Sequence, residues 1–200
     1  MRSKQDRRVE RTKRDLKNAL LYLIEEKRNI NSITITDIAE YANYNRTTFY
    51  AHYSDKESLL NEIKEDAITG FIESFRDPYK DKKRILHVQQ LKSSAIKIFE
   101  YVEKNSSLFL LLFNNSVFPG FQQQLCDALE KVFDHEIEFI GEHFQNMNKE
   151  LYSRIEAYSM IGMLDFWVTN AFNYSSNYMT EQLIQKIHYS PVIIKIKNHD

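Results

Sequence analysis

Turn-forming residues are scarce in this chain, and that scarcity limits the folds it can adopt. The 200 residues include only four glycines and three prolines: Gly70, Gly120, Gly141, Gly162, Pro78, Pro119 and Pro191. Sandwiches and barrels of many short strands need more turn residues than this. Long helices joined by short connections need few. We therefore expect an all-α fold of about nine helices.

Composition excludes several classes of protein. Hydrophobic residues make up 42% of the chain and aromatic residues 13%, enough for a substantial core rather than a disordered chain. The one cysteine, Cys126, excludes an internal disulfide and a cysteine-cluster zinc site, and its place beside Leu125 on an apolar stripe favours a core thiol over a redox sensor. Apolar runs are too short for a membrane span or a signal peptide, so we expect a cytoplasmic protein.

Charge is distributed unevenly along the chain. The formal net charge is −1, but residues 1–17 contain eight basic and three acidic residues, a net of +5. A basic N-terminal segment ahead of an acidic remainder suggests that one end contacts a polyanion. A solvated tail would have the same charge pattern, so charge alone leaves both interpretations open.

The first third of the chain predicts four helices. Apolar residues at spacings of three and four predict a helix over 6–27. Thr34 and Asp37 resemble a capping box at the start of the next helix, and Asn45 is a good N-cap for a short helix over 46–53. Between these two helices, Asn43 suits the left-handed conformation of a tight turn. A second capping box, Ser54 to Glu57, predicts a helix to about residue 75.

The remainder predicts a linker over 76–83 and five more helices, over 84–104, 107–114, 118–145, 149–174 and 180–189. Residues 191–200 could form a short strand or a tail. The 149–174 helix is apolar around much of its circumference, which indicates burial on several sides. We expect this helix and the last one to pair two chains, with Leu164 and Val168 in the contact.

Two short helices joined by a three-residue turn, close to a basic N-terminus, describe a helix-turn-helix; an ordinary helical hairpin is the alternative. In such a motif the second helix enters the major groove. Phe49 then anchors this helix from inside, while polar and cationic side chains face the bases and phosphates. The residues that we expect at the DNA are Thr36, Asn45, Arg46, Thr47, Thr48, Tyr50, His52 and Lys56.

The run from Ile35 to Leu60 resembles the DNA-binding domain of TetR/AcrR regulators, with ITDIAEYA, NYNRTTFYAHY and SDKESLL in register. The family's usual turn glycine is replaced by Asn43, and its small residue in the recognition helix by Thr47. The C-terminal half loosely resembles a Firmicutes-type domain of the same family. The resemblance implies a DNA-binding domain over 1–56, a linking helix to about 75, and a helical ligand-binding and dimerisation domain over 77–200.

The resemblance also implies a homodimer on a near-palindromic operator, and most often a repressor that a small ligand releases. Aromatic residues of the C-terminal half could line an apolar pocket for such a ligand, or could simply be core: Phe99, Phe109, Phe113, Phe133 and Trp167. A few relatives act as coactivators that bind a protein instead of DNA, which is the alternative function. We expect no catalytic residues, metal or cofactor, because no motif for them is present.

Overall fold

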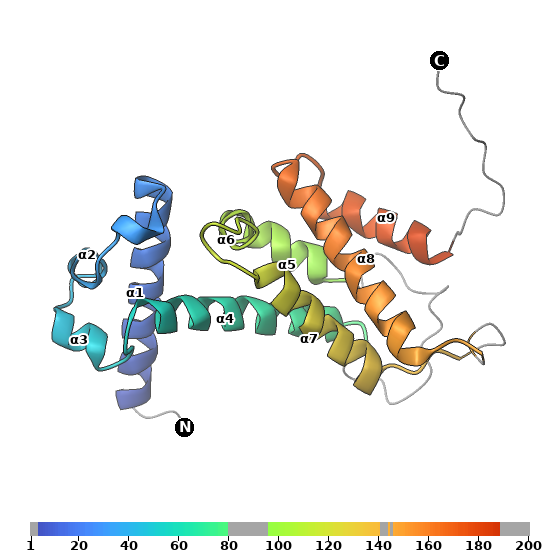
Figure 1. Cartoon of the computed structure of the whole chain (residues 1–200), viewed down its shortest axis with the longest axis horizontal. Helices are drawn as coiled ribbons and strands as arrows, with labels where there is room; N and C mark the ends of the chain where they lie inside the picture. Colours follow the sequence, from blue (N-terminus) through green and yellow to red (C-terminus); the bar gives the residue numbers. More distant parts are fainter. Residues whose placement is uncertain (1–3, 80–95, 141–143, 145, 189–200) are drawn as a thin grey trace, which may run out of the picture. The chain divides into compact units, whose positions relative to one another are not determined.

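The computed structural model describes residues 4–79, 96–140, 144 and 146–188 (Figure 1). The described residues are all helical or irregular and contain no strand, which confirms the all-α prediction. They form nine α-helices and one short 3₁₀ helix, η1. Within them, no helix is long and apolar enough to cross a membrane. The 191–200 segment, and the first part of the helix expected over 84–104, lie outside the described residues.

Contacts divide the chain into two compact units. The first comprises residues 1–69 and 107–125, and the second comprises residues 70–106 and 126–200. These divisions differ from the boundary expected between residues 56 and 77, and the functional boundary stays a prediction.

In the first unit, helix α1 (Lys4–Lys27) leads through η1 (Ile30–Ser32) into α2 (Ile35–Tyr41) and α3 (Arg46–Tyr50). The apolar face expected on α1 is buried, with Leu16 and Leu20 fully enclosed. Helix α4 (Lys56–Arg76) begins in this unit and contributes buried Leu59 and Ile63. Helix α6 (Ser106–Leu112), the start of α7 (Phe121–Glu136) and the connection between them add further core side chains, chiefly Phe109, Leu112, Phe118 and Phe121.

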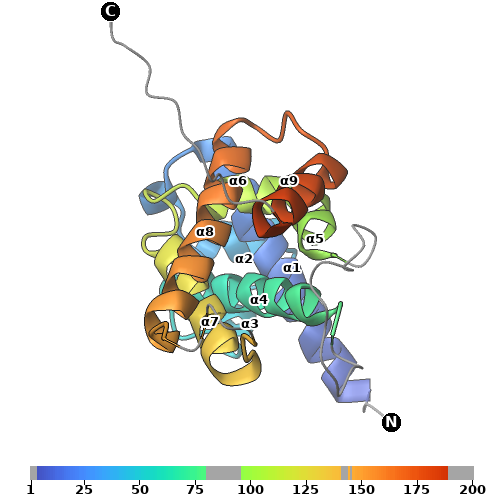
Figure 2. The ribbon, with the colours of Figure 1, turned by 90° about the vertical axis from the view of Figure 1, so that its right-hand side faces the viewer.

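The second unit is built from α5 (Ile98–Lys104), α8 (Lys149–Thr169) and α9 (Ser176–His188), with the remaining parts of α4 and α7. Helix α9 lies beside α5, as Figure 2 shows. The Glu103 carboxylate joins them, because it accepts hydrogen bonds of 2.8 and 2.6 Å from the backbone N–H and hydroxyl of Ser176. A carboxylate at a helix N-terminus satisfies donors that the helix leaves free.

Helices α7 and α8 both end several residues before the sequence predicts. Helix α7 stops at Glu136 rather than near 145, and Phe139 turns back to pack edge-on against Tyr152 with ring centroids 4.6 Å apart. Helix α8 stops at Thr169 rather than 174, because Ala171 and Phe172 adopt left-handed φ angles of 50° and 57°. The Phe172 ring then packs 4.9 Å from that of Trp167. In both places aromatic packing overrides the continuing apolar pattern.

Helix α8 also shows which of its apolar residues are internal. Leu164 is fully buried and Val168 is 5% exposed within the chain itself, so neither is available for contact with a second chain, contrary to expectation. The exposed apolar residues of α8 are instead Leu151, Ile155, Tyr158 and Phe166. A helix that is apolar on most sides does not indicate from its sequence which side faces the core.

Candidate nucleic-acid interface

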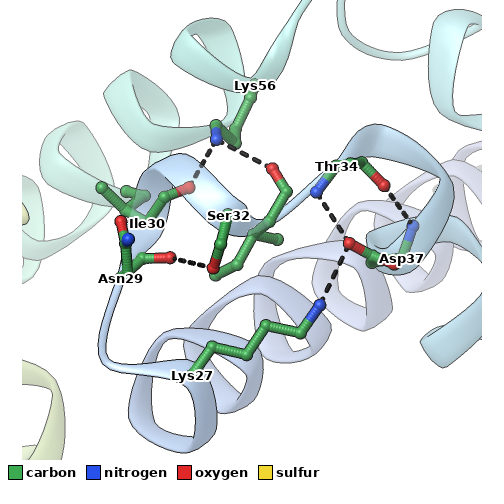
Figure 3. Close-up of polar contacts among 8 residues, drawn as sticks. Lys27, Asn29, Ile30, Ser32, Thr34, Asp37 and Lys56 are labelled. Carbon is green, nitrogen blue, oxygen red and sulfur yellow. Dashed lines mark hydrogen bonds and ion pairs between the residues drawn. The ribbon is translucent and has the colours of Figure 1, made fainter.

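The capping box predicted at the start of α2 is present. The Thr34 hydroxyl accepts a hydrogen bond from the Asp37 N–H at 3.1 Å, and the Asp37 carboxylate accepts one from the Thr34 N–H at 2.8 Å (Figure 3). The Lys27 ammonium approaches the same carboxylate at 3.1 Å. The backbone hydrogen bond to Thr34, followed by the contact with Lys27, lowers the pKa of Asp37 below its ordinary value. These contacts fix where α2 begins relative to the end of α1.

The turn between α2 and α3 depends on Asn43, whose φ of 59° lies in the left-handed region, as predicted. This conformation lets the Tyr44 N–H return to the Ala39 carbonyl oxygen at 2.8 Å. The Tyr44 hydroxyl then donates a 3.0 Å hydrogen bond to Asp15 on α1. Asparagine therefore replaces the glycine usual in such turns, because its side chain tolerates this conformation better than most.

The predicted N-cap of α3 is also present. The Asn45 carboxamide oxygen accepts hydrogen bonds from the Thr48 N–H at 2.8 Å and from the Thr48 hydroxyl at 3.0 Å. Phe49 is fully buried, which fixes the inner side of the helix. The helix ends at Tyr50 rather than Tyr53, and the His52 and Tyr53 N–H groups both reach the Phe49 carbonyl oxygen at 2.9 Å.

With Phe49 turned inward, the other side of α3 is open to solvent. Arg46, Thr47 and Tyr50 are exposed, while Thr48 is half-buried. Arg46 Nη2 donates a 3.2 Å hydrogen bond to the Tyr50 hydroxyl one turn later. Of the other residues expected at the DNA, Thr36 and His52 are half-buried and Asn45 is exposed. An exposed cation and hydroxyls on one short helix suit contact with base edges and phosphates.

Lys56 occupies a position that the sequence does not reveal. Its ammonium donates to the carbonyl oxygens of Ile30 at 2.6 Å and of Ile33 at 2.9 Å, both in the connection between α1 and α2 (Figure 3). Partial burial lowers the pKa of this ammonium. Two of its three N–H donors are thus engaged within the chain, and one is left for a phosphate. Spacing alone places Lys56 near DNA and cannot show these contacts.

The cap of α4 differs by one residue from the prediction. The Asp55 carboxylate, rather than the Ser54 hydroxyl, accepts the hydrogen bond from the backbone of the first turn, at 2.7 Å from the Ser58 N–H. The Ser58 hydroxyl lies 3.3 Å from the Asp55 N–H and completes the reciprocal pair. Aspartate and serine are about equally good N-caps, so two overlapping boxes in the sequence compete.

The basic N-terminal segment is helical from Lys4 and divides into two groups of side chains. Arg7, Arg8, Arg11 and Arg14 are exposed. Lys13 instead contacts Glu62 of α4 at 2.8 Å, and Lys17 contacts Glu62 at 2.6 Å and also Asp66. We call these four residues the α1–α4 ion-pair cluster. Charge counting predicts a basic surface but misses that two of its lysines are paired with α4.

The aromatic residues predicted to bind a ligand fall into separate clusters. Phe99 and Trp167 pack edge to face with centroids 5.7 Å apart, and both are fully buried. Phe109 and Phe113 lie in the other unit, 6.3 Å apart, and Phe133 packs 5.4 Å from Phe75. Two surface hollows of about 420 and 590 Å³ are lined by other residues, chiefly of α1 and α4 and of α1 and α2. The ligand role of the five aromatics stays a prediction.

Comparison with known proteins gives a consistent result. Residues 26–63 match the tetR family of bacterial regulatory proteins, and residues 89–189 match a transcriptional regulator C-terminal region. The uncharacterized HTH-type transcriptional regulator YxbF of Bacillus subtilis is 47% identical over 58 residues. That match covers 29% of this chain and only 15% of the length of YxbF, so it shows a likeness to one part of that protein.

Two solved structures resemble the chain over most of its length. A TetR transcriptional regulator from Streptococcus agalactiae has a TM-score of 0.57 and 25% identity, with 92% of this chain and 97% of that chain covered. A putative TetR-family regulator from Syntrophomonas wolfei has a TM-score of 0.65 and 18% identity, with 88% of this chain and 92% of that chain covered. The second likeness concerns the fold alone.

Proposed function

This chain belongs to the TetR family of bacterial regulatory proteins, a family of helix-turn-helix DNA-binding regulators of transcription, and from that premise we propose that it is a homodimeric repressor. Its operator is a near-palindrome, and a small apolar ligand releases it. Such a protein works on DNA in the cytoplasm and needs no catalytic residue or cofactor. The observation that carries the proposal is the solvent-exposed side of α3, together with the exposed arginines of α1 in the same unit.

DNA binding divides between base contacts and phosphate contacts. Arg46, at the first position of α3, contacts a base edge, because a guanidinium donates two parallel hydrogen bonds to guanine. Thr36, Asn45, Thr47, Thr48, Tyr50, His52 and Lys56 position the helix on sugars, phosphates or neighbouring bases. The remaining N–H of Lys56 suits a phosphate, since its other two donors reach Ile30 and Ile33.

Pairing of two chains is supported by an exposed apolar stripe on α8. Leu151, Ile155, Tyr158 and Phe166 are between 48% and 56% exposed. They lie at spacings of four, three and eight residues, which is one side of a helix. Gly162 falls within the same stripe, and a Cβ there would meet no atom within 4 Å. We call these five residues the α8 stripe. A second copy of α8 would cover this apolar surface, as in four-helix contacts.

Release by a ligand has weaker support, from the interior of the second unit. Ser153 is fully buried on α8, and its hydroxyl has no hydrogen-bond partner among the described residues. Buried hydroxyls are normally paired, so such a group suits a water or a ligand polar atom. Trp167 lies on the same inner side of α8, four turns away in sequence. An apolar ligand here regulates only if it binds two conformations with different affinity, a coupling of about 1–3 kcal/mol.

The test of this function is selection of bound DNA from a random pool of double-stranded fragments. We expect a near-palindrome whose half-sites are about one helical turn apart, roughly 34 Å, or a multiple of it. Recovery of only single asymmetric half-sites would contradict the dimeric repressor. Recovery of no DNA, together with binding of a protein partner, would favour a coactivator on the same scaffold.

Arg46 variants then separate base contact from charge. Arg46→Ala should weaken binding to the selected sequence by about 1–3 kcal/mol and abolish the preference at one base pair per half-site. Arg46→Lys keeps the charge but cannot donate two parallel hydrogen bonds from a planar group. It should therefore recover affinity for DNA in general but not the preference. If Arg46→Lys keeps the full preference, Arg46 acts only as a charge.

A further inference from the structure

Arg46 and Tyr50 are paired across the exposed side of α3. Arg46 Nη2 lies 3.2 Å from the Tyr50 hydroxyl oxygen, and the guanidinium carbon lies 5.7 Å from the centre of the Tyr50 ring. The two residues are four apart, the spacing at which helical side chains meet. The pair therefore combines a hydrogen bond with a cation–π contact.

The Tyr50 ring is itself held in place by a buried neighbour, Phe49. It packs edge to face against Phe49, with centroids 5.7 Å apart and an interplanar angle of 86°. Phe49 is fully buried, whereas Tyr50 is 47% exposed. An exposed arginine side chain is ordinarily free to adopt many rotamers. Contact with an anchored ring restricts Arg46 before any DNA is bound, which lowers the entropy lost on binding.

The hydrogen-bonding capacity of the pair is not exhausted by this contact. The Tyr50 hydroxyl accepts from Arg46 and keeps its own O–H to donate. The guanidinium has five N–H donors, so enough remain for two parallel bonds to a guanine edge. A phosphate oxygen could thus accept from Tyr50 while Tyr50 accepts from Arg46 and Arg46 donates to a base. Hydrogen bonds joined in this way strengthen one another.

We propose that Tyr50 is a positioning residue for Arg46, and that sequence preference at the base pair contacted by Arg46 depends on the Tyr50 hydroxyl. This inference rests on the proposed DNA-binding function and adds to it a specificity-determining residue. Tyr50 acts on sequence preference through Arg46. A tyrosine that only contacts a phosphate would change affinity for all sequences alike.

The decisive variant is Tyr50→Phe, which removes the hydroxyl and keeps the ring against Phe49. The probe is the double-stranded sequence selected by the wild-type protein, together with the same sequence changed at the base pair whose preference Arg46→Ala abolishes. Tyr50→Phe should lower the preference for the original base pair by roughly two- to fivefold, the lower part of the range for one hydrogen bond, because the ring and its contact with the guanidinium are kept. In the Arg46→Ala background the same substitution should leave the preference unchanged.

Tyr41→Phe is the matched control, because Tyr41 is also 47% exposed and stacks on Tyr22 in the same unit. It should leave the preference at the wild-type value. A second readout needs no DNA. In the free protein, ¹⁵N relaxation should show that the Arg46 side chain moves faster and over a wider range in Tyr50→Phe than in the wild-type protein. Its motion in Tyr41→Phe should equal that in the wild-type protein. Thermal unfolding followed by circular dichroism checks that each variant is folded.

The outcomes separate the two proposals. If the wild-type protein selects no sequence, the DNA-binding function fails. Independently of that result, Arg46 relaxation that is the same in Tyr50→Phe as in the wild-type protein would overturn the positioning role. If the wild-type protein selects a sequence but Tyr50→Phe weakens all sequences equally, in both backgrounds, the function stands and the inference is wrong. Loss of preference that disappears in the Arg46→Ala background supports it.

Discussion

The Lys56 ammonium lies 2.6 Å from the carbonyl oxygen of Ile30, so the first residue of α4 is bonded to the connection between α1 and α2. The Ile33 carbonyl oxygen, at 2.9 Å, is held by the same group. Ile30 begins the short 3₁₀ helix η1, and its carbonyl oxygen also accepts a hydrogen bond from the Ile33 N–H at 3.2 Å, whereas Ile33 is the residue at which η1 ends. One cation thereby links the start of α4 to the point where α2 begins.

Removing that cation should destabilise the first unit. Lys56→Met keeps the aliphatic part of the side chain and deletes the N–H donors. We expect the free energy of unfolding to fall by about 1.5–3 kcal/mol, the usual value of a hydrogen bond to a charged group. Urea unfolding monitored by circular dichroism measures it.

Lys27→Met is the control for this variant, because Lys27 lies close by and pairs with Asp37 on the surface. Surface ion pairs contribute little, so its loss should cost well under about 1 kcal/mol. Equal effects of the two substitutions would show that the Lys56 contacts with Ile30 and Ile33 do not stabilise the connection.

The α1–α4 ion-pair cluster should make the protein sensitive to acid. Burial disfavours ionisation of the Glu62 carboxyl, but hydrogen bonds from Lys13 and Lys17 outweigh it and leave its pKa below the ordinary value. A lowered folded-state pKa gives stability that is present above the unfolded-state pKa, about 4.3, and is lost as pH falls through the folded-state pKa. Glu62→Gln should therefore flatten the decrease in unfolding free energy between about pH 5 and pH 3.

Unfolding titrations at a series of pH values measure that decrease. Glu65→Gln, at an exposed position of the same helix, is the control. Its unfolding free energy should decrease with falling pH nearly as steeply as that of the wild-type protein. A wild-type curve that is already flat over this range would show that the Glu62 contacts with Lys13 and Lys17 do not contribute to stability.

The Cys126 thiol should be chemically inert in the folded protein. Cys126 is 1% exposed, and burial, followed by nearby Asp127 and Glu130, raises its pKa. The thiolate is the reactive form, so both access and ionisation are opposed. Iodoacetamide should not modify the native protein at pH 8 and should modify it fully in denaturant. Rapid labelling of the native protein would revive a redox-sensing role.

The local structure around the helix-turn-helix follows closely from the sequence. Thr34, Asn43 and Asn45 each perform the role that their side chains predict, because caps and tight turns are decided by the residue itself and its immediate neighbours. The spacing of apolar residues predicts that Phe49 points inward, and Phe49 is fully buried. Among α2, α3 and α4, only the start of α4 is predicted wrongly, by one residue, because the capping boxes at Ser54 and Asp55 overlap.

Features that depend on distant residues could not be predicted in this way. The contacts of Lys56 with Ile30 and of Lys17 with Glu62 join segments 26 and 45 residues apart in the chain. The end of α8 depends on the packing of Phe172 against Trp167, which the apolar pattern of the sequence does not show. The inward side of α8 likewise follows from tertiary packing, which is why Leu164 was expected in a dimer contact and is buried within the chain.

The α8 stripe gives the corrected test of pairing between two chains. Ile155, 52% exposed, lies within the stripe between Leu151 and Tyr158. Ile155→Glu should convert a dimer into monomers at micromolar concentration, a weakening of about 100-fold or more, because burying an unpaired carboxylate in an apolar contact costs several kcal/mol. Sedimentation equilibrium measures the change, and the fold should survive because the side chain is exposed within one chain.

Gln124→Glu adds the same charge at an exposed position of α7 and should remain dimeric. The two variants should then differ at the selected operator: Gln124→Glu should bind as the wild-type protein does, whereas Ile155→Glu should lose most of its affinity, since a single half-site holds one chain weakly. Binding by Ile155→Glu to an isolated half-site should remain at the wild-type level for one chain, which separates loss of pairing from loss of the DNA surface. A wild-type protein that sediments as a monomer, or an Ile155→Glu protein that sediments as a dimer, would show that the α8 stripe is not where two chains meet.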